Sequence, residues 1–592
     1  MKKRILALLL ALTLVLSACG ANDKKDGEEK PNTSEETPAT DKEEEKEQDS
    51  AKEEFKDGTY EASAPGFGGE IKLSVEVKDN KISDIEILEN KETDPVFNRA
   101  FPVIKERILA EQSPVVDNVS AATFSSYGVK KAVGLALKDA GVDFGEITMT
   151  TEPDHGEIEE KEDVNTQLVV VGGGPAGLTA AIEAKDNGVK DVILVEKLDI
   201  LSGNGKFDMN FFDMLNSKAM KENNVEVTKE EFLEAKEAAV DSDERKAVWV
   251  DGAWELDEWI RSIGIELNYN YGGDKGTSHM AEANEYAGDH IQEKLEERAI
   301  ELGVNIITGT KGVDLIIEDG KATGVKVEDR TSKYNIMADA VVVATGGFSA
   351  NKDLLKEYAP GGEIVETSNQ MGATGDFVKV FEDHDLKMDH MDVLTVFKLI
   401  IKNRRDLTGA GDGFVLVNKD AKRFAAENEG GLDLAHKILE QEDGKVFYIY
   451  DQALYESFYR LQKHNDLGYH VKADTIEELA EKIDLDAKTL EETINKYNAA
   501  CEGKEKDEFR EEMPEKPFDM NGPFYACQVE SAIHMTKGGV VANEKAEVIN
   551  NSDQVVEGLY AAGEVTDTSG NYSAAVVFGR VAGQEAAKFI NK

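Results

Sequence analysis

Cysteine is scarce in this chain, because only Cys19, Cys501 and Cys527 occur among its 592 residues. Three cysteines cannot form a disulfide framework, so the fold must depend on ordinary hydrophobic cores. Whether Cys501 and Cys527 pair stays open. The chain also lacks a C-x-x-C-H sequence, which excludes attachment of a c-type haem. It has no His/Cys cluster with metal-ligand spacing, so we expect no metal centre.

Basic residues are too few to balance the acidic ones: 68 Lys and Arg against 118 Asp and Glu give a formal net charge of -50. A chain without a basic stripe cannot neutralise the phosphates of DNA or RNA, so nucleic acid is excluded as a partner. The same charge repels the body of the protein from an anionic membrane surface.

An apolar run from Ile5 to Leu16 follows a basic start at the N-terminus. A basic start, a short apolar core and small residues before Cys19 are typical of an export signal, and the run is too short for a lasting membrane span. Leu16–Cys19 resembles a bacterial lipobox, in which Cys19 is lipidated; the alternative is an ordinary signal peptide with an incidental cysteine. We therefore predict a lipoprotein signal peptide at 1–19 and a lipid anchor in the cell membrane, on the extracytoplasmic face of a bacterium.

Two charged segments separate the regions that can fold. Residues 20–54 are acidic and polar with almost no apolar side chains, a composition that cannot bury enough surface to offset chain entropy. We predict that this segment is a disordered tether. A second charged stretch, Thr150–Asn165, is predicted to be a structureless linker.

The region 55–148 has the pattern of a small α+β domain. Ile71–Val77 and Ile82–Leu88 alternate apolar and polar residues on either side of Asp79-Asn80, which predicts a β-hairpin. A helix is expected around Phe101–Gln112, and a second helix is expected to end near Ala140.

The segment Asp117–Thr123 in this domain resembles the acceptor motif for covalently attached FMN. The domain as a whole resembles the FMN-binding domain of sodium-pumping quinone reductase subunits. This resemblance implies that a flavin transferase joins FMN to Thr123 through a phosphoester. Ala121 departs from the usual glycine, and the alternative for Thr123 is a threonine in a helix-capping turn.

A dinucleotide-binding fingerprint begins at Leu168, where an apolar strand runs into Gly172-Gly173-Gly174-Pro175-Ala176-Gly177 and then into an Ala-rich helix. Gly172 permits the tight turn, Gly174 allows the backbone to approach a pyrophosphate, and Gly177 allows close packing of helix and strand. The next strand ends at Glu196, where an acid is expected to bind a ribose hydroxyl. This pattern predicts a bound dinucleotide such as FAD.

Later segments complete this fold. Ala340–Gly347 is a buried strand that ends in paired glycines, and Gly558–Val565 is a second such strand before a final helix that ends near Ala587. We predict an α/β FAD-binding Rossmann-like domain with an inserted α+β capping domain, preceded by the small α+β FMN-binding domain. The expected boundaries are 55–148 for the FMN-binding domain, 166–389 and 534–592 for the FAD-binding domain, and 390–533 for the capping domain.

From about residue 166 the chain resembles the flavoprotein family of fumarate reductase and succinate dehydrogenase, in particular exported fumarate and urocanate reductases. The matching segments are Gly172–Gly177, Ser202–Lys206, Ala344–Phe348, Lys422–Phe424, His534–Gly539 and Gly563–Thr566. The resemblance implies noncovalent FAD. With the fingerprint, it gives these cofactor-binding residues: Gly172, Gly174, Pro175, Ala176, Gly177, Glu196, Lys197, Gly203, Asn204, Gly346, Gly347, Asp376 and Glu564.

The resemblance also implies two catalytic residues. Arg423 corresponds to an arginine that supplies a proton to the alkene, and His534 is expected to position the substrate or polarise its carbonyl. The alternatives are a solvent-exposed Arg423 and a hydrogen-bonded core histidine at 534.

Several family features are missing. The Glu-x-x-Arg proton path is absent at Asp406–Ala410, a His-Pro pair is replaced by Phe397-Lys398, and the loop Ser569–Tyr572 lacks a substrate-clamping arginine. A dicarboxylate needs two cationic anchors, so fumarate is not the expected substrate. Possible substitutes for the lost anchors are Tyr572, Lys398 and Arg405.

The sequence therefore predicts an FAD/FMN-dependent oxidoreductase. A membrane quinol- or flavin-linked donor would reduce FMN, and FAD would then pass a hydride to the C=C bond of an α,β-unsaturated acid or enone. One alternative is a dehydrogenase that runs in reverse. The other is an electron-transfer flavolipoprotein that relays electrons without a dedicated substrate.

Overall fold

The computed structural model describes residues 54–201, 203–206, 211–234, 240–271, 276–282, 285, 287–404, 406–409, 412–567 and 571–592. The predicted signal peptide with Cys19, the predicted tether up to residue 53, Arg405 and Ser569 lie outside these residues. Within the described ranges no helix is both long enough and apolar enough to cross a membrane. Cys501 and Cys527 are free thiols, so they do not pair.

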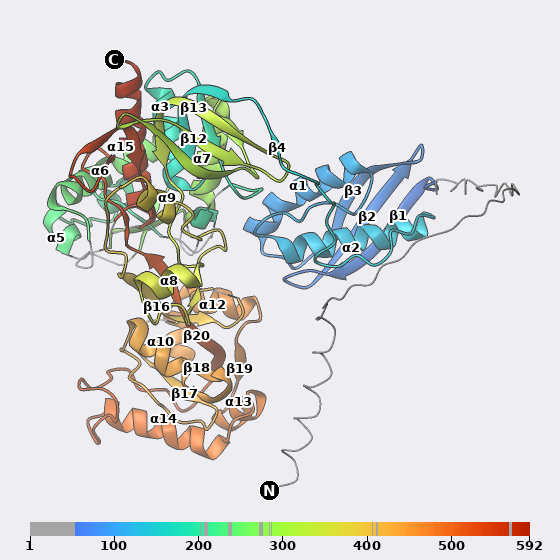
Figure 1. Cartoon of the computed structure of the whole chain (residues 1–592). Helices are drawn as coiled ribbons and strands as arrows, with labels where there is room; N and C mark the ends of the chain where they lie inside the picture. The colour runs from blue at the N-terminus through green and yellow to red at the C-terminus, as the bar shows by residue number, and fades with distance from the viewer. Residues whose placement is uncertain are drawn as a thin grey trace, which may run out of the picture. The chain divides into compact units, whose positions relative to one another are not determined.

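The N-terminal domain is an antiparallel sheet packed against two helices (Figure 1, blue). Its elements are β1 (Gly58–Pro65), β2 (Glu70–Lys78), β3 (Lys81–Glu89), α1 (Asp94–Glu111) and α2 (Thr123–Asp139). The expected hairpin is β2–β3, and Asp79 and Asn80 both have positive φ at its turn. α1 begins earlier than expected, because Pro near its N-terminus suits the first helical turn.

The predicted linker is not entirely without regular structure. It contains the two-residue strand β4 (Glu159–Glu160), which pairs in parallel with β13 (Ser332–Val343). Earlier in the same stretch, Glu152 accepts a hydrogen bond from the Asn118 side chain at 2.7 Å. These contacts attach the linker to both neighbouring domains.

The dinucleotide-binding domain is built on a nine-stranded sheet with the order β10-β6-β5-β13-β12-β23-β22, and β4 and β11 pair at its side. The parallel strands are β10 (Asn305–Ile307), β6 (Val192–Val195), β5 (Val164–Val171), β13 and β23 (Val555–Ala561). The remaining strands are β11 (Lys311–Glu318), β12 (Lys321–Glu328) and β22 (Glu547–Ile549). The central strands are buried on both faces, as their continuous Val/Leu runs predict.

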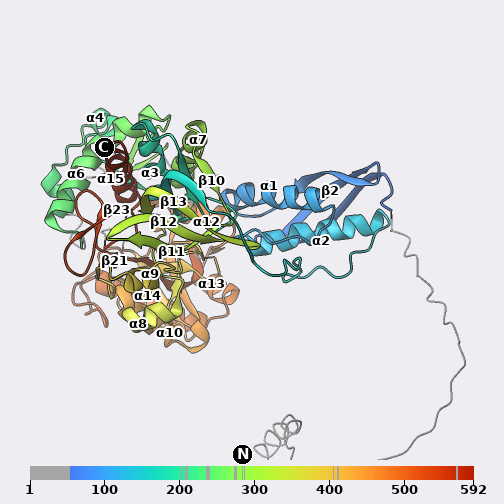
Figure 2. The same ribbon diagram turned by 45° about the horizontal axis from the view of Figure 1, so that its top comes forward.

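Helices α3 (Pro175–Asp186) and α15 (Tyr572–Ile590) pack closely beside one another in this domain (Figure 2). A Cβ at Gly579 would lie 2.5 Å from the Ala176 carbonyl oxygen, and one at Gly583 would lie 2.3 Å from that of Ala180. The small residues therefore allow the C-terminal helix to contact the backbone of the helix that begins at the glycine-rich turn. Helices α6 (Asp243–Ser262) and α7 (Gly288–Glu301) pack against this pair.

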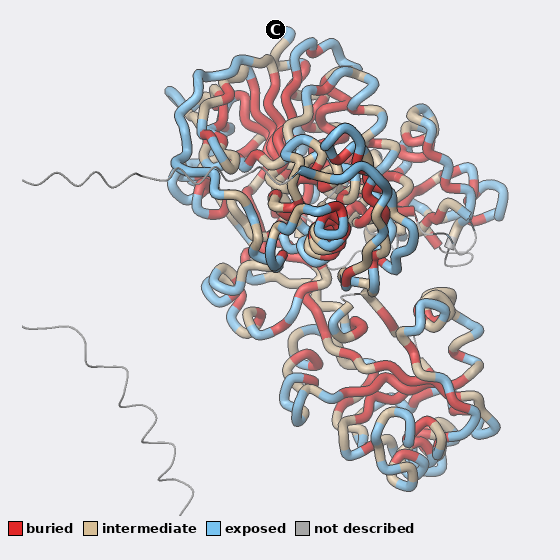
Figure 3. Tube along the Cα trace, turned by 90° about the vertical axis from the view of Figure 1, so that its right-hand side faces the viewer, coloured by how far each residue is buried: buried red, intermediate tan, exposed pale blue. Residues whose placement is uncertain are grey.

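The cap is a separate α+β domain. Its sheet appears as the lower group of buried red strands in Figure 3. The sheet contains β14 (Glu366–Thr367), β16 (Leu394–Ile401), β17 (Phe414–Asn418), β18 (Val446–Asp451), β19 (Val471–Ala473) and β20 (Phe524–Thr536). Its helices include α10 (Gly431–Leu439), α11 (Gln452–Ser457), α12 (Tyr459–Asp466), α13 (Ile476–Lys482) and α14 (Ala487–Cys501). β14 and the end of β20 lie outside the expected cap boundaries, and the expected helix 476–501 is divided in two.

Candidate active site: two adjoining cavities

A cavity of about 650 Å³ lies where the glycine-rich turn after β5 meets the loops that follow β13 and β23. Every FAD-binding residue predicted from the sequence lines it, except Gly177 and Asp376. We name it the FAD cavity, because its wall contains Gly172 and Gly174 of the dinucleotide fingerprint together with Glu196.

The three fingerprint glycines have different structural roles. Gly172 has φ +111, and a Cβ there would lie 2.3 Å from the Ala344 carbonyl oxygen. A Cβ at Gly177 would lie 1.9 Å from the Gly172 carbonyl oxygen, which explains why Gly177 does not line the cavity. Gly174 faces open space, with nothing within 4 Å of an added Cβ, at the N-terminus of α3. This open cradle at a helix N-terminus fits a pyrophosphate.

Two carboxylates, buried Glu196 and half-buried Glu564, lie in the wall of the FAD cavity. Glu196 accepts hydrogen bonds from the backbone N–H groups of Gly173 at 2.8 Å and Leu198 at 2.9 Å, and burial raises its pKa. Glu564 accepts from the backbone N–H of Thr536 at 3.0 Å, and burial raises its pKa to about 7. Carboxylates in these places are suited to accept hydrogen bonds from the hydroxyl groups of FAD.

Asp376 does not line the cavity itself, but it forms an ion pair with Lys197, which does. Its carboxylate lies 2.7 Å from the Lys197 ammonium and 3.0 Å from that of Lys311. This places Lys197 in the cavity wall beside Glu196.

His534 lies on β20 and lines both this cavity and a second one. Its Nδ1 is 3.0 Å from the Ser368 hydroxyl, and its ring centroid is 3.8 Å from that of Phe397. Burial, together with a smaller effect of the nearby charge of Arg460, lowers the pKa of His534 to about 3. The imidazole is therefore neutral at physiological pH and can donate a hydrogen bond without carrying charge.

Arg423 is placed away from both cavities. Its guanidinium lies 2.6 Å from the Glu427 carboxylate and 2.7 Å from that of Asp507, and it lies over the rings of Tyr497 and Phe509 at 5.3 and 5.2 Å from their centroids. Burial alone would lower the pKa of Arg423, but these two carboxylates raise it above its usual range. The structure therefore does not bring the predicted proton donor to the FAD cavity, and it assigns Arg423 to an ion-pair cluster inside the cap.

A different arginine, Arg460 at the start of α12, lines the FAD cavity together with Phe397 and Leu407. No motif in the sequence marks Arg460. Of the proposed substitute anchors, Tyr572 lines the cavity and donates from its hydroxyl to the Gly288 carbonyl at 3.1 Å. Lys398 instead donates to the Asn428 carbonyl at 3.0 Å.

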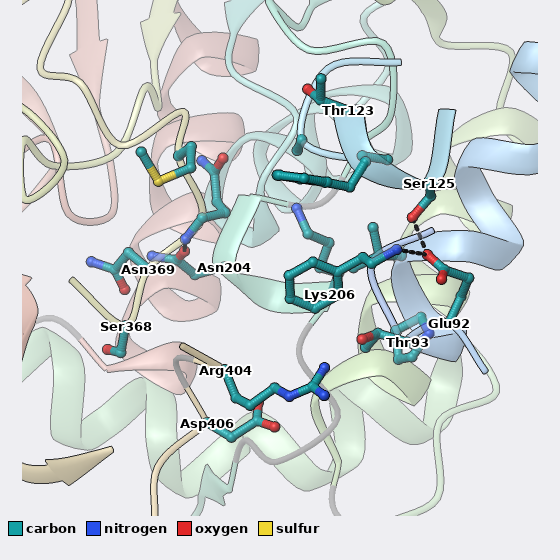
Figure 4. A pocket seen from close by; sticks show the side chains of 18 of the residues that line it. Glu92, Thr93, Thr123, Ser125, Asn204, Lys206, Ser368, Asn369, Arg404 and Asp406 are labelled. Carbon is teal, nitrogen blue, oxygen red and sulfur yellow. Dashed lines mark hydrogen bonds between the residues drawn. The ribbon is translucent and has the colours of Figure 1, made fainter. Parts of the chain in front are cut away.

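The second cavity, of about 400 Å³, surrounds Thr123 and is shown in Figure 4. Thr123 is the first residue of α2, so a phosphate on its hydroxyl would lie at a helix N-terminus, which favours negative charge. We name this the Thr123 cavity. It shares five wall residues with the FAD cavity: Asn204, Asn369, Gln370, Leu407 and His534.

The FMN-acceptor segment is held against the dinucleotide-binding domain by Asp199. Its carboxylate lies 2.5 Å from Arg107 and 2.7 Å from Arg330, and it accepts from the backbone N–H of Ser120 at 2.7 Å. Burial alone would raise the pKa of Asp199, but these donors lower it below its usual range. Within the described residues, no group of three His, Cys, Asp or Glu side chains could hold a metal ion.

Comparisons with known families agree with this geometry. The FAD binding domain family matches residues 167–575, and the FMN-binding domain family matches residues 66–138. The first match covers more than half of the chain.

Three curated relatives span most of the chain. NADH:fumarate oxidoreductase of Klebsiella pneumoniae is 27% identical over 90% of this chain, but the match spans only 59% of that protein. Urocanate reductase of Eggerthella lenta is 28% identical over 89% of this chain and 92% of its own length. Fumarate reductase (cytochrome) of Shewanella frigidimarina is 31% identical over 72% of this chain and 77% of its own length.

A solved structure of a flavocytochrome c3 fumarate reductase in an open conformation matches with a TM-score of 0.65 and 29% identity. The match covers 72% of this chain and 79% of that one. The chain therefore belongs to the fumarate reductase family of flavin-dependent oxidoreductases, with an FMN-binding domain at its N-terminal side.

Proposed function

We propose that this protein is an exported, lipid-anchored reductase that uses FMN on Thr123 and noncovalent FAD to reduce an α,β-unsaturated acid or enone other than fumarate. The observation that carries the proposal is the shared wall of the two cavities. Flavins in both would be separated by a few side chains, an arrangement that suits electron transfer between them. When bound, FAD would supply the electrons that reduce the C=C bond.

The cap end of the FAD cavity supports an acceptor with one carboxylate or carbonyl and an apolar remainder. Arg460 is the only arginine in the described part of this cavity's wall, and the apolar side chains of Phe397 and Leu407 line the same cavity. Arginine is the side chain that binds a carboxylate in bidentate fashion. A single arginine can anchor only one of the two carboxylates of fumarate in this way. The names of three relatives refer to urocanate, acrylate and a vinyl phenol, which supports a C=C acceptor without identifying it.

His534 is suited to polarise the acceptor. It is neutral, Ser368 orients its ring, and Phe397 packs against it. A preoriented N–H donor in a cavity shielded from water stabilises negative charge that develops on a carbonyl oxygen during reduction. Reduction also needs a proton on the second alkene carbon, and Arg423, which pairs with Glu427 and Asp507, lines neither cavity.

The activity test is a screen of acceptors with the flavinylated protein and a reduced viologen dye. We expect turnover of enoates or enones, with kcat/KM for fumarate lower by about 100-fold or more, as loss of a charged anchor predicts. Fumarate as the best substrate would overturn the choice of acceptor. Oxidation of the dye by soluble acceptors of any structure, unaffected by His534→Ala, would indicate a relay.

Attachment and location have separate tests. A peptide that contains Thr123 should carry the mass of one FMN when the chain is produced with a flavin transferase, and Thr123→Ala should lose it. Cys19→Ala should move the exported protein from the membrane fraction to the soluble fraction. An unmodified Thr123 peptide from the native host would contradict the FMN assignment.

A further inference from the structure

The Thr123 cavity is formed by three parts of the chain, although the predicted FMN acceptor belongs to one (Figure 4). The N-terminal domain contributes Phe67 and Phe124, whose side chains are 40% and 52% exposed and whose rings lie 6.5 Å apart. Two exposed aromatic rings beside an acceptor threonine are suited to contact a flavin ring. The other walls come from the cap and from the dinucleotide-binding domain.

Lys206 is the part of the dinucleotide-binding domain that enters this wall. It ends the short 3-10 helix Gly203–Lys206, and its side chain is only 1% exposed. Asn204 in the same turn accepts a hydrogen bond from the backbone N–H of Gln370 at 3.0 Å. A Cβ at Gly205 would lie 2.5 Å from the Gln292 side chain, so the turn is tightly packed and Lys206 is held in place.

The other charged groups of the wall are less suited to act on a flavin. Arg404 of the cap lies against the rings of Phe67 and Tyr469, and Figure 4 shows Asp406 beside it. Glu92 accepts hydrogen bonds from the Ser125 hydroxyl and from the backbone N–H of Gly68. Lys206 is therefore the cation that the dinucleotide-binding domain contributes to the wall of the Thr123 cavity.

We infer that Lys206 is a positioning residue for the FMN on Thr123, and that its charge stabilises the reduced form of that flavin. The inference rests on the proposed attachment of FMN. Uptake of two electrons and one proton leaves one negative charge on the flavin ring. A fixed cation in a poorly solvated wall stabilises that charge, and charge near the ring is a means by which proteins tune flavins.

This arrangement makes the reduction potential of FMN depend on the second domain. The N-terminal domain holds the flavin, and the dinucleotide-binding domain supplies the charge that sets how readily the flavin accepts electrons. Contact between the domains and reducibility of FMN are thereby coupled.

The test is an anaerobic reductive titration with dithionite and indicator dyes on the flavinylated, FAD-loaded protein. Lys206→Met should lower the equilibrium constant for FMN reduction at least about tenfold, which is about 30 mV for a two-electron couple. Lys206→Arg keeps the charge and should restore the potential. Lys138→Met removes an exposed lysine of α2 and should cause no shift. Each variant is repeated in a Thr123→Ala background, which reports FAD alone.

An FMN potential that is unchanged in Lys206→Met would overturn the inference, as would a shift that appears equally in the Thr123→Ala background. If Lys206→Met does not accumulate, Lys206→Gln provides the same comparison. The proposed function fails in a different way, because wild-type protein would then lack FMN mass on the Thr123 peptide. Mass spectrometry before each titration separates the two failures.

Discussion

The FAD cavity and the Thr123 cavity adjoin, but different kinds of residues line them. The first combines glycine-rich turns of the dinucleotide-binding domain, with Gly174 and Gly346 open toward its interior, with a cap side that includes Phe397 and Arg460. The second is lined by side chains from three parts of the chain, among them Phe67, Lys206 and Arg404. The difference matches the two modes of attachment, since a noncovalent dinucleotide needs many backbone contacts along its length.

A covalent bond to Thr123 would remove the need for such a cradle. The affinity of the Thr123 cavity for its flavin would come from one bond, so its walls are free to control orientation and charge. This explains why the sequence signature of the first cavity is extended and that of the second is short.

Gly174→Val should remove FAD almost completely while leaving the fold and the FMN on Thr123 intact. Nothing lies within 4 Å of a Cβ at this position and its φ is -79, so valine is tolerated by the protein but occupies the place of the pyrophosphate. Loss of close backbone approach should weaken FAD by about 100-fold or more, or about 3 kcal/mol. The FAD-to-protein ratio after gel filtration measures it.

Gly177→Val is the matched control for that experiment. Its Cβ would lie 1.9 Å from the Gly172 carbonyl oxygen, so this variant should fail to fold instead of losing FAD selectively. Full FAD occupancy in Gly174→Val would show that the phosphates lie elsewhere.

Arg423→Met and Arg460→Met should separate cap stability from substrate binding. Removing Arg423 leaves the buried carboxylate of Asp507 without its ion-pair partner, while Glu427 keeps Arg510 at 3.1 Å, and should lower the free energy of unfolding by about 3 kcal/mol. Arg460→Met should cost less stability, because methionine can keep packing against the Phe211 and Phe458 rings, and it should raise KM for an acidic acceptor by about 10- to 100-fold. Denaturant unfolding and steady-state kinetics measure the two effects.

The opposite result would reassign the arginines. A stable Arg423→Met protein that binds both flavins but cannot reduce any acceptor would restore Arg423 as the proton donor. An enone without a carboxylate serves as a control acceptor, because its KM should respond weakly to Arg460→Met.

These two arginines show where sequence patterns are informative and where they are not. Gly172, Gly174 and Glu196 were predictable because a backbone that approaches phosphate requires glycine, and one short segment carries the pattern. Arg423 follows a strand in a recognisable motif, yet its side chain points to Glu427 and Asp507. Arg460 stands in a helix without a motif, and only tertiary packing brings it to the cavity.

The Thr123 cavity was predictable in part for the same reason. The acceptor segment is local in sequence, so Thr123 could be identified. Lys206 and Arg404 reach the cavity only through contact between separate parts of the chain, a contact that includes Asp199 with Arg107 and Arg330. No spacing in the sequence encodes such an assembly.

Glu564 makes the FAD cavity sensitive to pH in FAD-depleted protein. Burial raises its pKa from 4.5 to about 7, so the folded state holds a proton that the unfolded state releases, and stability falls as pH rises from 4.5 to 7. Glu564→Gln has no proton to lose at this position, so its stability should not fall in this way. Its free energy of unfolding relative to that of wild type should therefore rise by about 2–3 kcal/mol between pH 4.5 and pH 8. Denaturant unfolding at both pH values measures it. An equal difference at both pH values would contradict the prediction, and bound FAD should reduce the trend by donating to the carboxylate.

Ala121→Gly, a substitution in the backbone of the Thr123 cavity, should have the smallest effect on stability. Ala121 has φ 69, a left-handed conformation that favours glycine, which gives a physical reason for the usual glycine at this place in the acceptor motif. Ala121→Gly relieves strain of about 1–2 kcal/mol but increases the entropy of the unfolded chain by about 0.4–1 kcal/mol, so the net stabilisation should be below about 1 kcal/mol. The fluorescence of covalent FMN in the full-length protein reports unfolding of this domain in denaturant. FAD occupancy should stay constant, because Ala121 does not line the FAD cavity. A loss of stability in Ala121→Gly, or a fall in flavinylation of Thr123, would mean that the alanine methyl group contributes packing that outweighs its strained backbone.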